Sequence, residues 1–268
     1  MALEALSLAS GSSGNSILVR DGGTAILIDA GIGIRNLTAA LRYRGTDPSE
    51  LDAILITHEH SDHIRGAVRT AKRFDVPLMA NALTLQAIIG AEHVPTRVIG
   101  GDEHVCFGDM EVRSFRISHD AVCPVGYTIS TSNGTITNVT DTGVLLPQIS
   151  AEAANADLVI LESNYDDEML LDGPYPYFLK RRIKSEIGHL SNEAAAGFII
   201  DLAESGKTPS VWLAHLSQVN NSPAIALAAA QHLLWTCSGV PMDISVALRD
   251  IPSLHWVCSN TRRQFSIP

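Results

Sequence analysis

Four side chains of types that bind metal ions lie within six residues of the sequence: His58, His60, Asp62 and His63. They follow the apolar run 53–56, which has the length and composition of a buried strand, and an amphipathic pattern begins after them. Imidazole and carboxylate groups are ligands of zinc and other divalent ions. The segment 57–63 therefore predicts a metal site on a strand-to-helix loop, because such side chains at fixed short offsets are rare in an ordinary solvated loop.

Alternation along an extended segment divides this cluster into two parts. His58 and His60 lie on the same side and can bind one ion, whereas Asp62 and His63 point elsewhere and can bind a second. Glu59 alternates away from both histidines, so we expect it to support a ligand from behind or to face solvent.

Three single residues at the ends of other expected strands could complete such a site: His119, Asp141 and His215. A lone residue at a strand end is often a cap or a turn residue. However, two ions need a shared carboxylate and further imidazoles, which these residues supply if their strands end at one edge. Asp29 closes another strand, either as a turn residue or as a group that orients a ligand; both interpretations stay open.

Short strands dominate the first 140 residues, and buried strands alternate with helices afterwards. The turn at Asn133-Gly134 and the later Asp141 repeat the order of Gly22-Gly23 and Asp29, which suggests two similarly built halves. The loop 10–15 is expected to be a hairpin turn rather than a phosphate cradle, because no Gly-Lys-Ser/Thr follows it. The expected helices cover about 34–41, 64–74, 191–206 and 222–237, and the segment 166–189 is expected to be an irregular active-site loop.

The composition is that of a globular protein, with 46% hydrophobic residues and a net charge of -10. This charge argues against a surface that is basic as a whole, so any phosphate binding must be local. The four scattered cysteines predict reduced thiols and a cytoplasmic location, and no signal peptide or apolar membrane span is expected. We expect one domain over 1–250 and a weakly patterned tail, 251–268, whose basic end holds Arg262 and Arg263.

Taken together, the seven candidate ligands resemble the metal-binding motifs of the metallo-β-lactamase fold superfamily. Further segments resemble its YycJ/WalJ group, namely 10–16, 119–121, 124–127, 173–182, 188–192 and 214–217. The resemblance covers about residues 3–235. It implies a four-layer αβ/βα sandwich, in which two mixed β-sheets are flanked by helices, and a metal-dependent phosphodiesterase or exonuclease related to RNase Z and the β-CASP nucleases.

The resemblance also implies the roles of individual residues. His58, His60 and His119 would hold the first of two divalent ions. Asp62, His63 and His215 would hold the second, and Asp141 would bridge them. A metal-bridging hydroxide would be the nucleophile, and both zinc and manganese fit these ligands. His189 would contact the phosphate or protonate the leaving oxygen, oriented by Glu162, for which a neutral cap is the alternative.

Aromatic and cationic side chains occur together in the segment 175–184, and four of them are candidate substrate-binding residues: Tyr177, Lys180, Arg181 and Arg182. This composition suits a nucleic-acid track with stacking surfaces. The alternative is a solvated basic helix that packs its aromatic side chains inward. His93, His104 and His232 lie outside every motif, and we expect them to be structural or exposed.

The sequence thus predicts a dinuclear metal-dependent hydrolase that acts on DNA or RNA, with no membrane partner. The alternative keeps the metal site but changes the substrate, to a thioester of the glyoxalase II type or to another small molecule.

Overall fold

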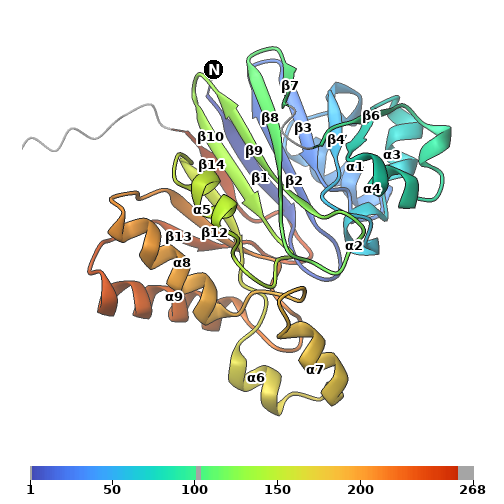
Figure 1. Cartoon of the computed structure of the whole chain (residues 1–268). Helices are drawn as coiled ribbons and strands as arrows, with labels where there is room; N and C mark the ends of the chain where they lie inside the picture. Colours follow the sequence, from blue (N-terminus) through green and yellow to red (C-terminus); the bar gives the residue numbers. More distant parts are fainter. Residues whose placement is uncertain (1, 101–103, 259–268) are drawn as a thin grey trace, which may run out of the picture.

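Two seven-stranded β-sheets form the centre of the computed structural model, which describes residues 2–100 and 104–258 (Figure 1). The first sheet has the order β14-β1-β2-β3-β4-β5-β6 and the second has the order β13-β12-β11-β10-β9-β8-β7. The strands of the first sheet are β1 (Glu4–Ala9), β2 (Ser16–Asp21), β3 (Thr24–Ile28), β4 (Ala53–Leu55), β5 (Leu78–Ala80), β6 (Thr96–Val98) and β14 (His255–Val257). Those of the second are β7 (His104–Phe107), β8 (Met110–Arg116), β9 (Val125–Thr131), β10 (Gly134–Val139), β11 (Leu158–Glu162), β12 (Ser210–Ala214) and β13 (Ile244–Val246).

Both sheets are mixed and share one plan. In the first, β1, β2 and β3 pair antiparallel and β3 to β6 pair parallel. In the second, β7 to β10 pair antiparallel and β10 to β13 pair parallel. Parallel pairs need crossover connections, which bring helices onto the faces of a sheet. This common plan agrees with the repeated hairpin-and-aspartate order in the sequence.

Helices cover the outer face of each sheet, which gives four layers and confirms the predicted fold class. One apolar cluster lies between the sheets, a second joins the first sheet to α1 and α3, and a third joins the second sheet to α5, α8 and α9. The α-helices are α1 (Ile34–Tyr43), α2 (Ser61–Ile64), α3 (Ala67–Phe74), α4 (Ala82–Ala87), α5 (Pro147–Ala153), α6 (Asp167–Asp172), α7 (Tyr177–Ile183), α8 (Asn192–Glu204) and α9 (Pro223–Cys237). Two 3₁₀ turns cover Pro48–Glu50 and Ala91–His93.

The central strands are apolar on both faces because both faces are covered. At the start of the chain, Leu3 and, in β1, Ala5 contribute to the cluster between the sheets, whereas Leu6 and Leu8 of β1 contribute to the outer cluster. Successive side chains of a strand point to opposite faces, so a strand that is buried on both sides has a continuous apolar sequence.

The structure corrects two expectations about helices. The expected helix 64–74 is divided at Gly66, whose N–H donates to the carbonyl of Ala30; a Cβ at this position would lie 2.2 Å from the Ile32 carbonyl oxygen. The segment 166–189 is not wholly irregular but holds α6 and α7. The Asp166 side chain caps α6 by accepting from the Met169 N–H, and Pro176 precedes α7.

Part of the expected tail lies in the first sheet. His255–Val257 forms β14, which pairs antiparallel with β1, and the Ser7 N–H donates to the Leu254 carbonyl. The boundary at residue 250 stays a prediction, and Arg262 and Arg263 lie outside the described residues. Among the described helices, none combines the length and apolar character that crossing a membrane requires.

Gly31 permits the closest backbone approach beneath the loop 57–63. Its N–H donates to the Asn15 carbonyl, and a Cβ here would lie 1.6 Å from the Asp62 carbonyl oxygen. We predict that Gly31→Ala lowers the free energy of unfolding by about 3 kcal/mol, since backbone on both sides must move. Urea denaturation measures this change. Gly23→Ala, where a Cβ meets open space, is the control and should change stability by less than about 0.5 kcal/mol; equal effects of the two substitutions would refute the prediction.

Candidate metal centre

Strand ends from both sheets bring the candidate ligands together at one edge of the fold. The loop 57–63 follows β4, His119 follows β8, Asp141 follows β10 and His215 follows β12. Because the parallel strands of each sheet point their carboxyl ends in one direction, residues far apart in the sequence meet there.

Several overlapping sets of ligand atoms among the described residues lie close enough together to hold an ion. Those of His58, His60 and His119 lie within 4.8 Å of one another, and so do those of Asp62, His63 and His215. Asp141 reaches both groups: its Oδ2 is 3.2 Å from His63 Nε2, and its Oδ1 is 3.7 Å from His119 Nε2. Two further sets overlap these, one of His58, His63 and Asp141 and one of Asp141, Glu162, His189 and His215, so the assignment of ligands to two ions stays a prediction.

Four of the histidines are held in one orientation by oxygen atoms near Nδ1. His58 Nδ1 is 3.0 Å from Thr57 Oγ1, His63 Nδ1 is 2.7 Å from Asp29 Oδ2, and His119 Nδ1 is 3.0 Å from the Gly188 carbonyl. His215 Nδ1 is 3.0 Å from Glu162 Oε1. An acceptor at Nδ1 fixes the proton there and leaves the Nε2 lone pair for a metal ion.

Several of these ligand atoms are buried without a hydrogen bond. Within residues 2–100 and 104–258, His58 Nε2, His215 Nε2 and Asp141 Oδ2 have no hydrogen-bonding partner of suitable geometry. Buried polar atoms in folded proteins nearly always have a partner, and an ion supplies one where the protein does not. The donor set therefore fits divalent metal ions.

Backbone strain is concentrated at the same strand ends. Asp29, Asp141 and His215 have φ values of 58°, 60° and 55°. This left-handed region is unfavourable for residues other than glycine, and it persists where surrounding contacts hold the residue in place. Each strand thus turns sharply where its side chain enters the site.

Asp29 is both a turn residue and an orienting group. One carboxylate oxygen accepts from the Thr57 N–H, and the other accepts from the Thr57 hydroxyl and from His63 Nδ1. Both interpretations of this residue from the sequence are therefore correct. Its carboxylate fixes the start of the loop 57–63 and the ring of His63.

Buried carboxylates make the site favourable for positive charge. Burial alone lowers the pKa of His63, but the carboxylates of Asp29 and Asp141 raise this pKa well above its ordinary value. Burial raises the pKa of Asp141, but His215 and His63 hold it well below its ordinary value. In contrast, burial and the neighbouring His63 lower the pKa of His58, which favours the neutral imidazole that binds metal.

Glu162 joins His189 to the centre. Its Oε1 is 2.8 Å from His189 Nδ1 and 3.0 Å from His215 Nδ1, and its Oε2 accepts from the N–H groups of Thr142 and Leu190. Burial raises the pKa of Glu162, but His189 lowers it below the ordinary value. The contacts with two histidines support an orienting group, which stays a prediction. The His189 ring lies 5.1 Å from that of His119 and 5.3 Å from that of His215, between the two groups.

Two residues that contact the candidate ligands were not predicted from the sequence. Asn15 Nδ2 lies 3.0 Å from His63 Nε2, and Ser10 Oγ accepts from the His215 N–H. Both belong to the loop between β1 and β2, which does form a tight turn, with the Gly14 N–H donating to Gly11. The motif 10–16 was one of the segments in the family resemblance, and this was the signal that could have revealed them.

The expected substrate-binding residues lie on and beside α7, with its aromatic side chains exposed. Tyr177 and Phe178 are 75% and 74% exposed, so the interpretation of a helix with inward aromatics is wrong for this pair. The Arg181 guanidinium lies 6.0 Å from the Tyr177 ring centre. Arg182 forms an ion pair with Asp120, beside His119, and Lys180 Nζ donates to the Leu171 carbonyl.

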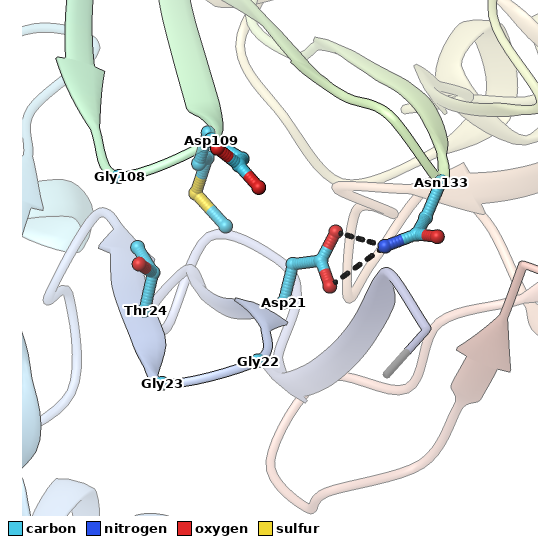
Figure 2. Close-up of a pocket in the computed structure, with 8 residues that line it drawn as sticks. Asp21, Gly22, Gly23, Thr24, Gly108, Asp109 and Asn133 are labelled. Atoms are coloured by element: carbon cyan, nitrogen blue, oxygen red, sulfur yellow. Dashed lines mark hydrogen bonds between the residues drawn. The ribbon is translucent and has the colours of Figure 1, made fainter.

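Three other histidines and the pocket of Figure 2 lie away from the centre. His93, His104 and His232 are exposed, as expected. The pocket in Figure 2, of about 350 Å³, lies among the turns at the opposite ends of the strands, where Asn133 Nδ2 donates to both carboxylate oxygens of Asp21. This contact ties the β2–β3 turn to the β9–β10 turn and holds the two sheets together far from the centre.

Comparison with known proteins identifies the family. A model of the beta-lactamase superfamily domain matches residues 24–215. The chain is 37% identical over 247 residues to "Exodeoxyribonuclease WalJ" of Streptococcus pneumoniae, covering 89% of this chain and 91% of that protein. This chain is a WalJ/YycJ-like member of the beta-lactamase superfamily. It is also 37% identical over 233 residues to "Exodeoxyribonuclease YycJ" of Bacillus anthracis, covering 85% of this chain and 87% of that protein.

Solved structures show the same fold. The metallo-β-lactamase fold protein YhfI of Bacillus subtilis superposes with a TM-score of 0.71 at 17% identity, covering 94% of this chain and 99% of that one. The short form of human tRNase Z gives a TM-score of 0.65 at 15% identity, covering 96% and 99%. The family membership and the ligand clusters show that this WalJ/YycJ-like protein is a hydrolase that depends on divalent metal ions.

The position of Asp29 behind His63 leads to a prediction about metal affinity. We predict that Asp29→Ala weakens metal binding by about 10-fold to 100-fold, because His63 loses the acceptor that orients it. Isothermal titration of the metal-stripped protein with Zn²⁺ or Mn²⁺ measures the affinity. Asp109→Ala, at the exposed pocket of Figure 2, is the matched control. An Asp29→Ala variant that binds metal as tightly as the control would contradict the orienting role.

Proposed function

We propose that this protein is an exonuclease that hydrolyses phosphodiester bonds at the end of a nucleic acid, and that DNA is its substrate. The observation that carries the proposal is His189, a partly exposed histidine that Glu162 holds between two groups of buried ligand atoms. The names of the two relatives that cover most of the chain support DNA and an exonucleolytic mode.

Two divalent ions are proposed as cofactors. His58, His60 and His119 would hold one, and Asp62, His63 and His215 would hold the other, with Asp141 between them. When bound, such a pair supplies a nucleophile near neutral pH and neutralises charge on the scissile phosphate. Imidazole and carboxylate donors suit both Zn²⁺ and Mn²⁺.

His189 is the protein's own proton-handling group in this proposal. Glu162 accepts from Nδ1, so Nε2 is the atom that can meet the substrate. As the imidazolium, with a proton on each ring nitrogen, His189 would donate a hydrogen bond from Nε2 to a phosphate oxygen or give the Nε2 proton to the leaving oxygen, which leaves the neutral ring with its Nδ1 proton on Glu162. Glu162 is 0% exposed and acts through His189 and His215, which makes it a positioning residue.

The exposed side chains of α7 are proposed to contact the substrate strand. Tyr177 offers a ring on which a base can stack, and Arg181 offers a cation for the backbone. Lys180 and Arg182 support this surface, since their side chains bind the Leu171 carbonyl and Asp120. The small-molecule alternative, a thioester hydrolase of the glyoxalase II type, is less well supported, because an exposed aromatic and cationic helix suits an extended strand better.

A cytoplasmic location is part of the proposal. It is supported by the four free thiols among the described residues, Cys106, Cys123, Cys237 and Cys258.

The proposed activity predicts a strong effect of Asp62. Metal-loaded wild-type protein should release nucleotides stepwise from end-labelled DNA, and Asp62→Ala should lower this rate at least about a hundredfold, since the second ligand group loses its carboxylate. Gel assays with DNA, RNA, a thioester and a lactam, run in parallel, measure the preference. A substrate preference for the thioester, or full nuclease activity in Asp62→Ala, would overturn the proposal.

A second prediction separates His189 from the metal ligands. We expect His189→Ala to lower kcat on DNA by about 10²-fold to 10⁴-fold while the bound metal, measured by mass spectrometry, stays at the wild-type amount. Loss of metal from this variant would make His189 a ligand and refute its role as a proton donor. His232→Ala, which removes an exposed histidine of α9, serves as the control.

A further inference from the structure

A groove of about 410 Å³ lies beside the loop 57–63, and the proposed function does not account for it. It is lined by residues from this loop, from the start of α3 and from the segment that follows α4: Glu59, Ser61, Ile64, Arg65, Val68, Arg69, Ile88 and Ile89. Its volume lies in the range of small-ligand sites. Figure 1 shows α3 and α7 well apart, so the groove and the α7 surface are separate.

The cations at this groove are not paired with acids. Among residues 2–100 and 104–258, no ion pair involves Arg65 or Arg69, whereas Arg182 in α7 and Lys184 after it pair with Asp120 and Asp167. Arg65 and Arg69 lie four residues apart and line the groove together. In a chain with a net charge of -10, two exposed arginines without acidic partners that line one groove supply local positive charge for a phosphate group.

Arg65 connects the groove to the metal centre. It follows Asp62 and His63 by three and two residues, and its Nη1 donates to the Ser13 carbonyl over 2.9 Å. Ser13 lies in the same turn as Asn15, which contacts His63. Arg65 and a ligand of the centre thus contact the same turn, which places the groove beside the centre.

The remaining walls suit a base rather than a second phosphate. Ile89 is 94% exposed, and with Ile64 and Val68 it gives the groove apolar surface. Apolar side chains of this kind pack against unstacked bases in nucleic-acid complexes. Glu59, the single acid among the lining residues, accepts from the Val122 N–H through one oxygen, and its charge keeps a phosphate away from that wall.

We propose that this groove is a nucleotide subsite, which binds one nucleotide of the substrate strand on the side of the centre away from α7. The phosphate lies on Arg65 and Arg69, and the base lies against Ile89. This inference rests on the proposed nuclease function and extends it, because it requires the strand to pass the centre rather than to end there.

The test compares the double variant Arg65→Ala/Arg69→Ala with wild type on a single-stranded DNA of twelve nucleotides and on bis(p-nitrophenyl) phosphate, a small diester too short to reach the groove. We expect the KM for DNA to rise about tenfold in the double variant. Its kcat/KM should fall at least tenfold more on DNA than on the small diester. The slope of log affinity for DNA against log salt concentration should also become less negative by about 1 to 2, as expected when two phosphate contacts are lost.

Controls make the failure of this inference distinct from the failure of the proposed function. Lys207→Ala, after α8 and at the opposite end of the strands, should behave as wild type. The Arg65→Lys/Arg69→Lys variant should restore most of the salt dependence. Ile89→Ala should raise the KM for DNA and leave the salt dependence unchanged. If wild type cleaves DNA and the double alanine variant cleaves it equally well, the groove is not a subsite. If wild type cleaves no nucleic acid, the proposed function itself fails.

Discussion

The buried carboxylate of Asp141 is the constraint on which the rest of the site depends. It is 2% exposed, lies near His63 and His215, and leaves one oxygen without a hydrogen bond among the described residues. A charged group in this position is strongly unfavourable unless positive charge compensates it. The two groups of imidazoles, and the ions that they would hold, are what make this carboxylate stable inside the fold.

The common plan of the two sheets explains how this arrangement arises. Asp29 and Asp141 each follow the strand at which pairing changes from antiparallel to parallel, and each has a left-handed backbone. Their roles nevertheless differ. Asp29 lies behind His63 and fixes its orientation, whereas Asp141 faces both ligand groups. One structural position has thus become a support in the first half and a proposed bridging ligand in the second.

The sequence predicted the parts of the site that depend on local order. Residues 58–63 could be recognised because their spacing alone places them on one loop, and His119, Asp141 and His215 because each follows an apolar strand. Asn15, Ser10 and the close approach of Gly31 depend on how distant segments meet, which residue spacing does not encode; for Asn15 and Ser10 the only signal was the family resemblance of the segment 10–16. The helices α6 and α7 were missed because each is only six or seven residues long and depends on its cap and its neighbours.

The central claim is that one edge of this fold holds two ions between the seven converging ligands. Anomalous diffraction from crystals of the protein loaded with Mn²⁺ or Zn²⁺ tests it most directly. The account predicts two peaks, one bordered by His58, His60 and His119 and the other by Asp62, His63 and His215, with the carboxylate of Asp141 between them. A single peak, or peaks away from these side chains, would contradict it.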